Sequence, residues 1–138
     1  MNKLTITKTV HLKAPASHVW KFLTEANRLG EWFHRGKSDL VSKGGYALLS
    51  DKSEEETLIW GDILEFNPHK RLVHTFTHGH LQGVETTCTW SLVEIDGGTI
   101  LTLVHEGWEK VGEAAFDMTA NHDVGWDDHF ARLRKAVS

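Results

Sequence analysis

A chain of 138 residues is long enough to bury a sizeable core, and we expect one domain over residues 1–138. The net charge of −4, with no Lys- or Arg-dense face, argues against a nucleic-acid partner. The single cysteine, Cys88, permits no internal disulfide and fits a reducing compartment. No long apolar run indicates a signal peptide or a membrane span, so the predicted location is the cytoplasm.

The first 33 residues predict one strand and two short helices. Apolar residues alternate with threonines from Leu4 to Leu12, the pattern of a half-buried strand. The segment "APASHVWKFLT" places Pro15 in a first helical turn and then repeats apolar residues at helical spacing. The segment "NRLGEWF" predicts a second short helix that carries Trp32 and Phe33.

The middle of the chain predicts about five strands joined by short turns, among them "NPHK" at 67–70 and "DGG" at 96–98. Period-two geometry puts alternate side chains on the same face of a strand. The residues expected on the inner face include Trp60 with Leu64, His74 with Phe76, Cys88 with Trp90, and Leu103 with His105.

The last part of the chain predicts a long helix. The residues that helical spacing places in one stripe along this helix are His122, Trp126, His129, Phe130, Leu133 and Val137. The start of this helix stays open, with Asn121 or Asp123 as caps and "GEAAFDMTA" as an earlier turn or a separate piece. We interpret Gly125 as a site of close packing between helix and sheet, and Trp126 as a pocket residue.

This order of elements predicts an α+β fold, in which one long helix covers the apolar face of a curved antiparallel sheet. Such an arrangement tends to leave space between helix and sheet, and large rings would line it. Six tryptophans in so short a chain fit this expectation.

Four segments follow one another along the chain: "VHLKAPASHVWKFLTEANRLGEWF", "WGDILEFNPHKRLVHTF", "TCTWSLVEIDGGTILTLVHEGW" and "GWDDHFARL". In this order they resemble the heat-shock ATPase activator homologue family of the START-like superfamily, to which the birch pollen allergen fold and polyketide cyclases also belong. The resemblance implies a helix-grip fold, with a deep apolar cavity that the long helix closes and the short helices flank. It also implies that the ligand is a lipid, a polyketide or another apolar aromatic molecule.

The family takes its name from co-chaperones that carry a separate N-terminal domain. This chain starts directly at the first strand, so we expect no chaperone partner. We expect a monomer or a weak homodimer.

We predict that a small hydrophobic molecule binds in the cavity. The residues expected to bind it are Trp32, Phe33, Trp60, His74, Phe76, Trp90, Leu103, His105 and Trp126. His105 is the first candidate for orienting a ligand hydroxyl or carbonyl, and it equally fits a structural role through a backbone carbonyl.

The segment "HTFTHGH" at 74–80 resembles a metal site, but its geometry argues against one. His74 and His78 lie roughly 13 Å apart along a strand at about 3.3 Å per residue, too far to hold one ion. We therefore predict neither a metal nor a cofactor, and place His78 and His80 at a hairpin end.

An enzyme of the cyclase or aromatase type is the main alternative. It requires that Asp62 faces inward beside His74 and His105, because a buried Asp–His pair would supply acid–base chemistry. A module that interacts with a chaperone is the third hypothesis.

Overall fold

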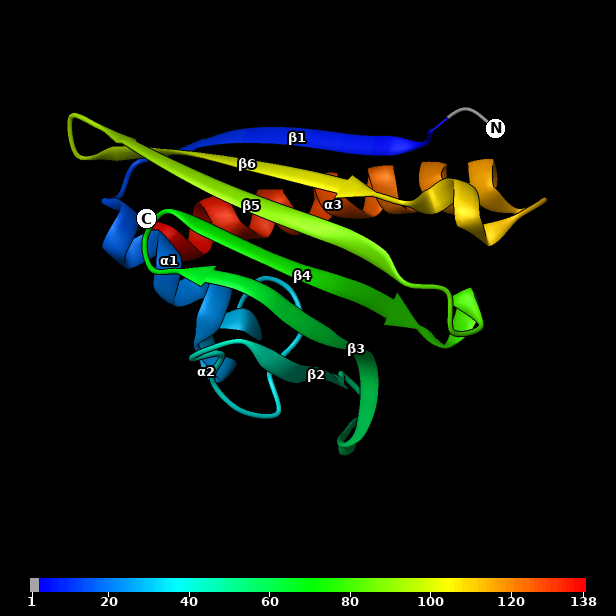
Figure 1. The fold of residues 1–138 in the computed structure, drawn as a ribbon. Helices are drawn as coiled ribbons and strands as arrows, with labels where there is room; N and C mark the ends of the chain where they lie inside the picture. Colours follow the sequence, from blue (N-terminus) through cyan, green and yellow to red (C-terminus); the bar gives the residue numbers. More distant parts are fainter. Residues whose placement is uncertain (1–2) are drawn as a thin grey trace.

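The computed structural model describes residues 3–138, with Glu54 described by its backbone alone. Six antiparallel strands form one curved sheet in the spatial order β1-β6-β5-β4-β3-β2, and a long helix lies against it (Figure 1). The elements are β1 (Thr5–Leu12), α1 (Ala16–Thr24), α2 (Ala26–Leu29), β2 (Gly44–Ser50), β3 (Ser53–Asn67), β4 (Arg71–His78), η1 (Gly79–Leu81), β5 (Thr86–Ile95), β6 (Gly98–Glu106), η2 (Trp108–Val111) and α3 (Ala115–Val137). This is the predicted α+β helix-grip fold.

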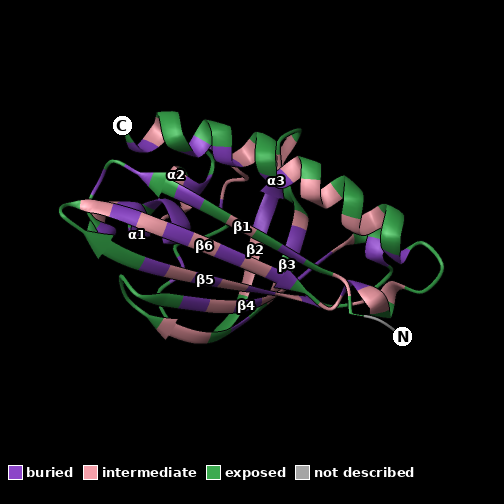
Figure 2. Ribbon diagram, turned by 90° about the horizontal axis from the view of Figure 1, so that it is seen from above, coloured by how far each residue is buried: buried purple, intermediate pink, exposed green. Residues whose placement is uncertain are grey.

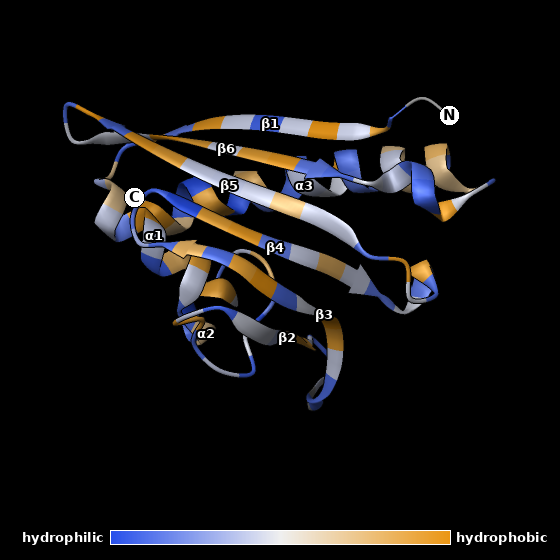
Figure 3. Ribbon diagram, viewed as in Figure 1, coloured by the Kyte–Doolittle hydropathy of each residue, from blue (hydrophilic) through white to orange (hydrophobic). Residues whose placement is uncertain are grey.

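Consecutive strands pair through short turns, except that β1 joins the far edge of the sheet beside β6. The predicted "DGG" hairpin is present: Asp96 and Gly97 both have positive φ, 53° and 81°, between the paired residues Ile95 and Gly98. Two central residues of positive φ match the twist of the flanking strands, which favours this turn. Apolar and polar residues alternate along much of the sheet (Figure 3), as one-sided burial requires.

Helix α3 covers the concave face of the sheet with one buried stripe, as Figure 2 shows from above. The stripe contains Trp126, Phe130, Leu133 and Val137. The helix begins at Ala115, so the segment whose place was open at the sequence level belongs partly to it. Among the described residues, no helix has both the length and the hydropathy to cross a bilayer.

A pair of ion contacts ties α3 to the edge strand β1. The ammonium of Lys8 lies 2.9 Å from a carboxylate oxygen of Asp123 and 3.0 Å from one of Asp127. The two aspartates are one helical turn apart, so both point to the same side of α3. Their charges are thereby directed toward β1.

The predicted inner face of β3 is wrong at Trp60 and Leu64. Ile59 and Ile63 are buried, whereas Trp60 is 40% exposed and Leu64 is 49% exposed. The pairing of β3 with β4 shifts between Ile63 and Glu65, and such a bulge changes which residues face inward along the strand. The strand has apolar residues on both faces, so alternation alone could not select the right one.

The second helix is shorter than the segment "NRLGEWF" for which it was predicted. Helix α2 ends at Leu29, and Trp32 and Phe33 follow it in an irregular segment. The indole N–H of Trp32 donates to the Phe22 carbonyl at 2.9 Å, which fixes a buried ring without helical backbone.

Candidate functional site

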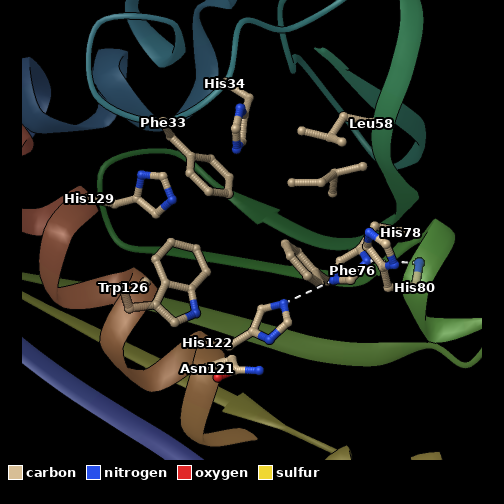
Figure 4. Close-up of a pocket in the computed structure, with 12 residues that line it drawn as sticks. Phe33, His34, Leu58, Phe76, His78, His80, Asn121, His122, Trp126 and His129 are labelled. Carbon is tan, nitrogen blue, oxygen red and sulfur yellow. Dashed lines mark hydrogen bonds between the residues drawn. The ribbon is translucent and has the colours of Figure 1, made fainter. Parts of the chain in front are cut away.

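An open pocket lies between α3, the end of β4, strand β3 and the segment that follows α2 (Figure 4). Its volume is about 320 Å³, at the lower end of the range for small-molecule sites. The residues that line it are Phe33, His34, Leu58, Ile59, Phe76, His78, His80, Asn121, His122, Gly125, Trp126 and His129. We call this the histidine-rimmed pocket.

Three aromatic rings form the apolar floor of this pocket. Phe33 stacks on Trp126 with ring centroids 5.0 Å apart, and Phe76 lies 6.4 Å from Trp126. The three come from the segment after α2, from α3 and from β4, so the floor exists only when all three elements are packed. Leu58 and Ile59 of β3 complete the apolar wall.

A second hollow lies under the floor, but it has only about 30 Å³, space for about one water. Trp32, His74 and Trp90 line it. Trp90 and Phe130 both pack against Trp32, with centroids 6.2 and 6.0 Å away. Large rings therefore fill most of the interior, and the larger space opens beside the middle of α3.

His74 is held by a complete set of hydrogen bonds. Its Nε2 accepts from the indole N–H of Trp90 at 2.9 Å, so its Nδ1 carries the proton and donates to the Thr75 carbonyl at 2.8 Å. The Tyr46 hydroxyl lies 3.0 Å from the same nitrogen and donates to the same carbonyl at 2.6 Å. Burial lowers the pKa of His74 to about 4, because the ring has lost the water that would solvate its charge.

His105 is also fully satisfied, behind Trp126. Its Nδ1 accepts from the Trp126 indole N–H at 3.1 Å, so its Nε2 donates to the Thr86 hydroxyl at 2.7 Å. That hydroxyl donates in turn to the Phe76 carbonyl at 2.9 Å. Burial holds the pKa of His105 well below its usual range. This chain of bonds orients Trp126, which lines the histidine-rimmed pocket.

A histidine pair closes one end of the pocket. The Nε2 atoms of His78 and His122 lie 2.9 Å apart, and their rings stack with centroids 5.1 Å apart. His122 Nδ1 donates to the Met118 carbonyl at 2.8 Å, so its Nε2 accepts from His78 Nε2–H. His78 Nδ1 then accepts from the His80 backbone N–H at 3.3 Å. One set of neutral tautomers satisfies the pair.

The other end of the pocket carries His34 and His129, which flank Phe33. Their ring centroids lie 5.6 Å apart, and His129 meets Phe33 edge-on at 4.7 Å. Arg132 donates to Nδ1 of His129 at 2.7 Å, while His34 Nδ1 lies 3.3 Å from a carboxylate oxygen of Asp51. Burial is the main cause that lowers the pKa of His129 to about 4.

Gly125 lies in the wall of the pocket, and the packing role predicted for it is wrong. A Cβ added at Gly125 would meet no atom within 4 Å. The missing side chain therefore widens the pocket rather than bringing α3 closer to the sheet.

The acid–base group required by the enzyme alternative is not assembled. Asp62 is exposed on the outer face of β3, where its backbone N–H donates to the Thr75 hydroxyl at 2.8 Å. Both ring nitrogens of His74 and of His105 are engaged in the bonds described above. Among the described side chains, no group of three or more His, Cys, Asp or Glu is arranged to hold a metal ion.

The structure distributes the nine predicted ligand residues over four environments. Phe33, Phe76 and Trp126 line the histidine-rimmed pocket, whereas Trp32, His74 and Trp90 line the small hollow. Leu103 and His105 are fully buried and line neither space. Trp60 is on the outer face.

Sequence reasoning missed most of the rim. The residues it did not assign to the pocket are His34, Leu58, Ile59, His78, His80, Asn121, His122, Gly125 and His129. Two signals pointed there, the histidines of "HTFTHGH" and the histidines of the helical stripe. Nothing in the linear pattern showed that these two sets meet.

Comparison with known proteins gives one family and many similar folds. The family described as Activator of Hsp90 ATPase homolog 1-like protein matches residues 13–138. No curated protein sequence matches the chain. Protein BH1534 of Bacillus halodurans is 28% identical, with a TM-score of 0.77 and 100% of both chains covered.

Two further solved structures share the fold at lower identity. DynU16, a putative protein in the dynemicin biosynthetic locus, is 21% identical with a TM-score of 0.76, and the match covers 97% of this chain and 47% of that one. The Aha1 dimer from Colwellia psychrerythraea is 13% identical with a TM-score of 0.71, and the match covers 96% and 95% of the two chains. These likenesses extend over nearly the whole chain.

Proposed function

The chain belongs to the Activator of Hsp90 ATPase homolog 1-like family, and on that premise we propose that it binds a small hydrophobic molecule, aromatic or lipid-like, in the histidine-rimmed pocket. The observation that carries the proposal is the pocket itself. It is open to solvent beside the middle of α3, yet its floor is built from Phe33, Phe76 and Trp126. Three large rings around an open space are typical of a site that recognises an apolar body.

The size of the pocket sets the scale of the affinity. An aromatic body that buries about 200 Å² gains about 5 kcal/mol at ~25 cal/mol per Å², before the costs of association and ordering. From this apolar term alone we therefore expect weak binding, with a Kd of roughly 0.2 mM at the tightest. Polar groups on the rim would then set orientation and selectivity. The location of DynU16 in a biosynthetic locus supports a polyketide-like aromatic as one ligand class to test.

A panel of flavonoids, fatty acids and polyketide-like aromatics tests this proposal by NMR shift mapping. We expect at least one class to shift Phe33, Phe76, Trp126 and their neighbours in a saturable manner. Trp60 is an internal control, because its indole lies on the outer face. The absence of any saturable shift in the pocket residues across the panel would refute the proposal.

Interaction with a chaperone is a second candidate, and the description of the family is what favours it. The test is the ATPase rate of an Hsp90-type chaperone measured with and without the protein, together with a pull-down. An unchanged rate and no recovered chaperone would dispose of this candidate without affecting the first.

A further inference from the structure

The histidine pair at the end of the pocket has a complete set of hydrogen bonds when both rings are neutral. His78 Nε2–H donates to His122 Nε2, and the two Nδ1 atoms are engaged with the backbone at His80 and Met118. With both rings neutral, every ring nitrogen has a partner. The pair therefore needs no ligand and no ion to be satisfied.

One additional proton on the pair can disrupt the hydrogen bond between the two rings. Two ring nitrogens carry no proton, His78 Nδ1 and His122 Nε2, and a proton added at His122 Nε2 would replace the hydrogen bond that it accepts from His78. Two N–H donors would then face each other across 2.9 Å, and the rings would repel. If the two rings move apart, an oxygen with negative charge can replace their direct contact and accept both N–H groups at hydrogen-bond distance. Hydrogen bonds of this charge-assisted kind are about twice as strong as neutral ones.

Few other charges compete at this place. Among the described residues that line the pocket, none is Lys, Arg, Asp or Glu. The titratable groups that face the pair are His80 from η1 and His105 from β6, whose ring centroids lie 5.8 Å from His78 and 6.4 Å from His122, respectively. Asp123, one residue after His122, is held by Lys8 toward β1. Among the described residues that line this pocket, an anion at the pair has no cation to pair with except a protonated histidine.

The pair also adjoins the aromatic floor. The Phe76 ring lies 5.9 Å from His78 and 6.2 Å from His122, and Trp126 lies next to Phe76. Figure 4 shows the His78–His122 contact at one end of the pocket, with the large rings extending toward His129. A ligand with its ring over the floor would bring a substituent to the pair.

We propose that the ligand of this pocket is an aromatic weak acid, whose anionic oxygen inserts between His78 and His122 and is bound together with one proton. This inference rests on the proposed function and names its ligand class. The protons balance for a carboxylate: it enters as the anion, one proton comes from solvent, and His122 Nε2 carries that proton in the complex. No covalent bond forms or breaks.

The charge state of the unoccupied pair agrees with this scheme. Burial, His122 and His80 lower the pKa of His78 to about 4, and burial lowers the pKa of His122. Both rings are therefore neutral at pH 7, and the proton must be taken up when the anion binds. Binding of the anion should then weaken about tenfold for each unit by which the pH rises between 6 and 8.

Isothermal titration calorimetry with two matched probes tests the proposal. The probes are 2-naphthoate, which carries the anionic oxygen, and 2-naphthalenemethanol, which carries a neutral hydroxyl on the same ring system. Titrations at pH 6, 7 and 8, each in two phosphate-free buffers of different ionisation enthalpy, count the protons exchanged. We expect about one proton taken up with naphthoate and none with the alcohol.

Two variants assign the proton to the pair. In His122→Gln, naphthoate binding should lose both its proton uptake and its dependence on pH, while the alcohol should bind within about threefold of the wild type. His78→Gln should behave in the same way, and it serves as the second variant if the first does not fold. His11→Gln changes an exposed histidine on β1 and should alter nothing.

The outcomes separate the two proposals. If the alcohol binds but naphthoate binds no tighter at pH 6 and takes up no proton, the weak-acid inference is wrong and the proposed function stands. Proton uptake that persists in both Gln variants also overturns the inference. If neither probe binds at any pH, and the wider panel gives no saturable shift, both proposals fail.

Discussion

Replacing Gly125 by Ala separates the stability of α3 from the capacity of the pocket. The new methyl group would meet no atom within 4 Å, so it creates no clash. A glycine inside a helix costs about 1 kcal/mol relative to alanine. At about 2.1 cal/mol/K per residue, the unfolding entropy of this chain is roughly 0.29 kcal/mol/K, so Tm should rise by about 3 °C.

The same methyl group projects into the histidine-rimmed pocket, which Gly125 helps to line. A ligand that fills the pocket should therefore bind Gly125→Ala several-fold more weakly, although the protein is more stable. Calorimetry of unfolding and a titration with any ligand found in the panel measure the two effects. Val124→Ala is the matched control. Val124 precedes Gly125 and its side chain is 61% exposed, so its replacement should not affect binding.

Two results would refute this reasoning. A lower Tm for Gly125→Ala would mean that the space beside the helix is filled. An unchanged affinity, with the expected rise in Tm, would mean that the ligand does not contact this part of α3.

Three further changes test other parts of the structure. Trp60→Thr should cost at most about 1 kcal/mol of unfolding free energy in urea and leave ligand binding unchanged, because this ring is on the outer face; a loss of several kcal/mol would contradict the corrected register. Trp90→Phe removes the N–H donated to His74 Nε2 and should cost about 1–3 kcal/mol, and a neutral result would refute that bond. The pKa of His74 is about 4 in the folded protein against 6.5 when unfolded, so the unfolded state binds more protons between these values. The contribution of His74 alone should thus be full above pH 6.5 and fall by on the order of 3 kcal/mol toward pH 4, and urea unfolding that is equally hard at pH 7 and pH 4.5 would contradict this.

The parts of the fold that the sequence predicts well are those with strong local signals. The "DGG" turn fixed a hairpin because Asp96 and Gly97 adopt the positive φ that such a turn demands. The alternation from Thr5 to Leu12 and the stripe that contains Trp126 and Phe130 each selected one face. In these segments, periodicity and burial agree.

Prediction failed where the local pattern of apolar residues fits either face of a strand as the buried one. Strand β3 carries apolar residues on both faces, and the bulge after Ile63 decides which side the rest of the strand presents. A bulge depends on pairing with β4, which the strand's own sequence does not encode. Trp60 lies before the bulge, and alternation alone did not show that Ile59 and Ile63 face inward there instead.

The candidate site was only partly predictable, because it is made by tertiary contacts. His78 and His122 are 44 positions apart, and each was read within its own segment. His105 had two readings at the sequence level, and the bonds to Thr86 and Trp126 select the structural one. The rings at Phe33, Phe76 and Trp126 were foreseen as pocket residues, since large aromatic side chains on inward positions have few other places to go.

Intermolecular nuclear Overhauser effects between a bound aromatic ligand and isotope-labelled protein test the central claim most directly. We expect contacts from ligand protons to the side chains of Phe33, Phe76 and Trp126, and none to Trp60. Contacts confined to Trp60 or to other surface residues, with none to the three floor rings, would contradict it.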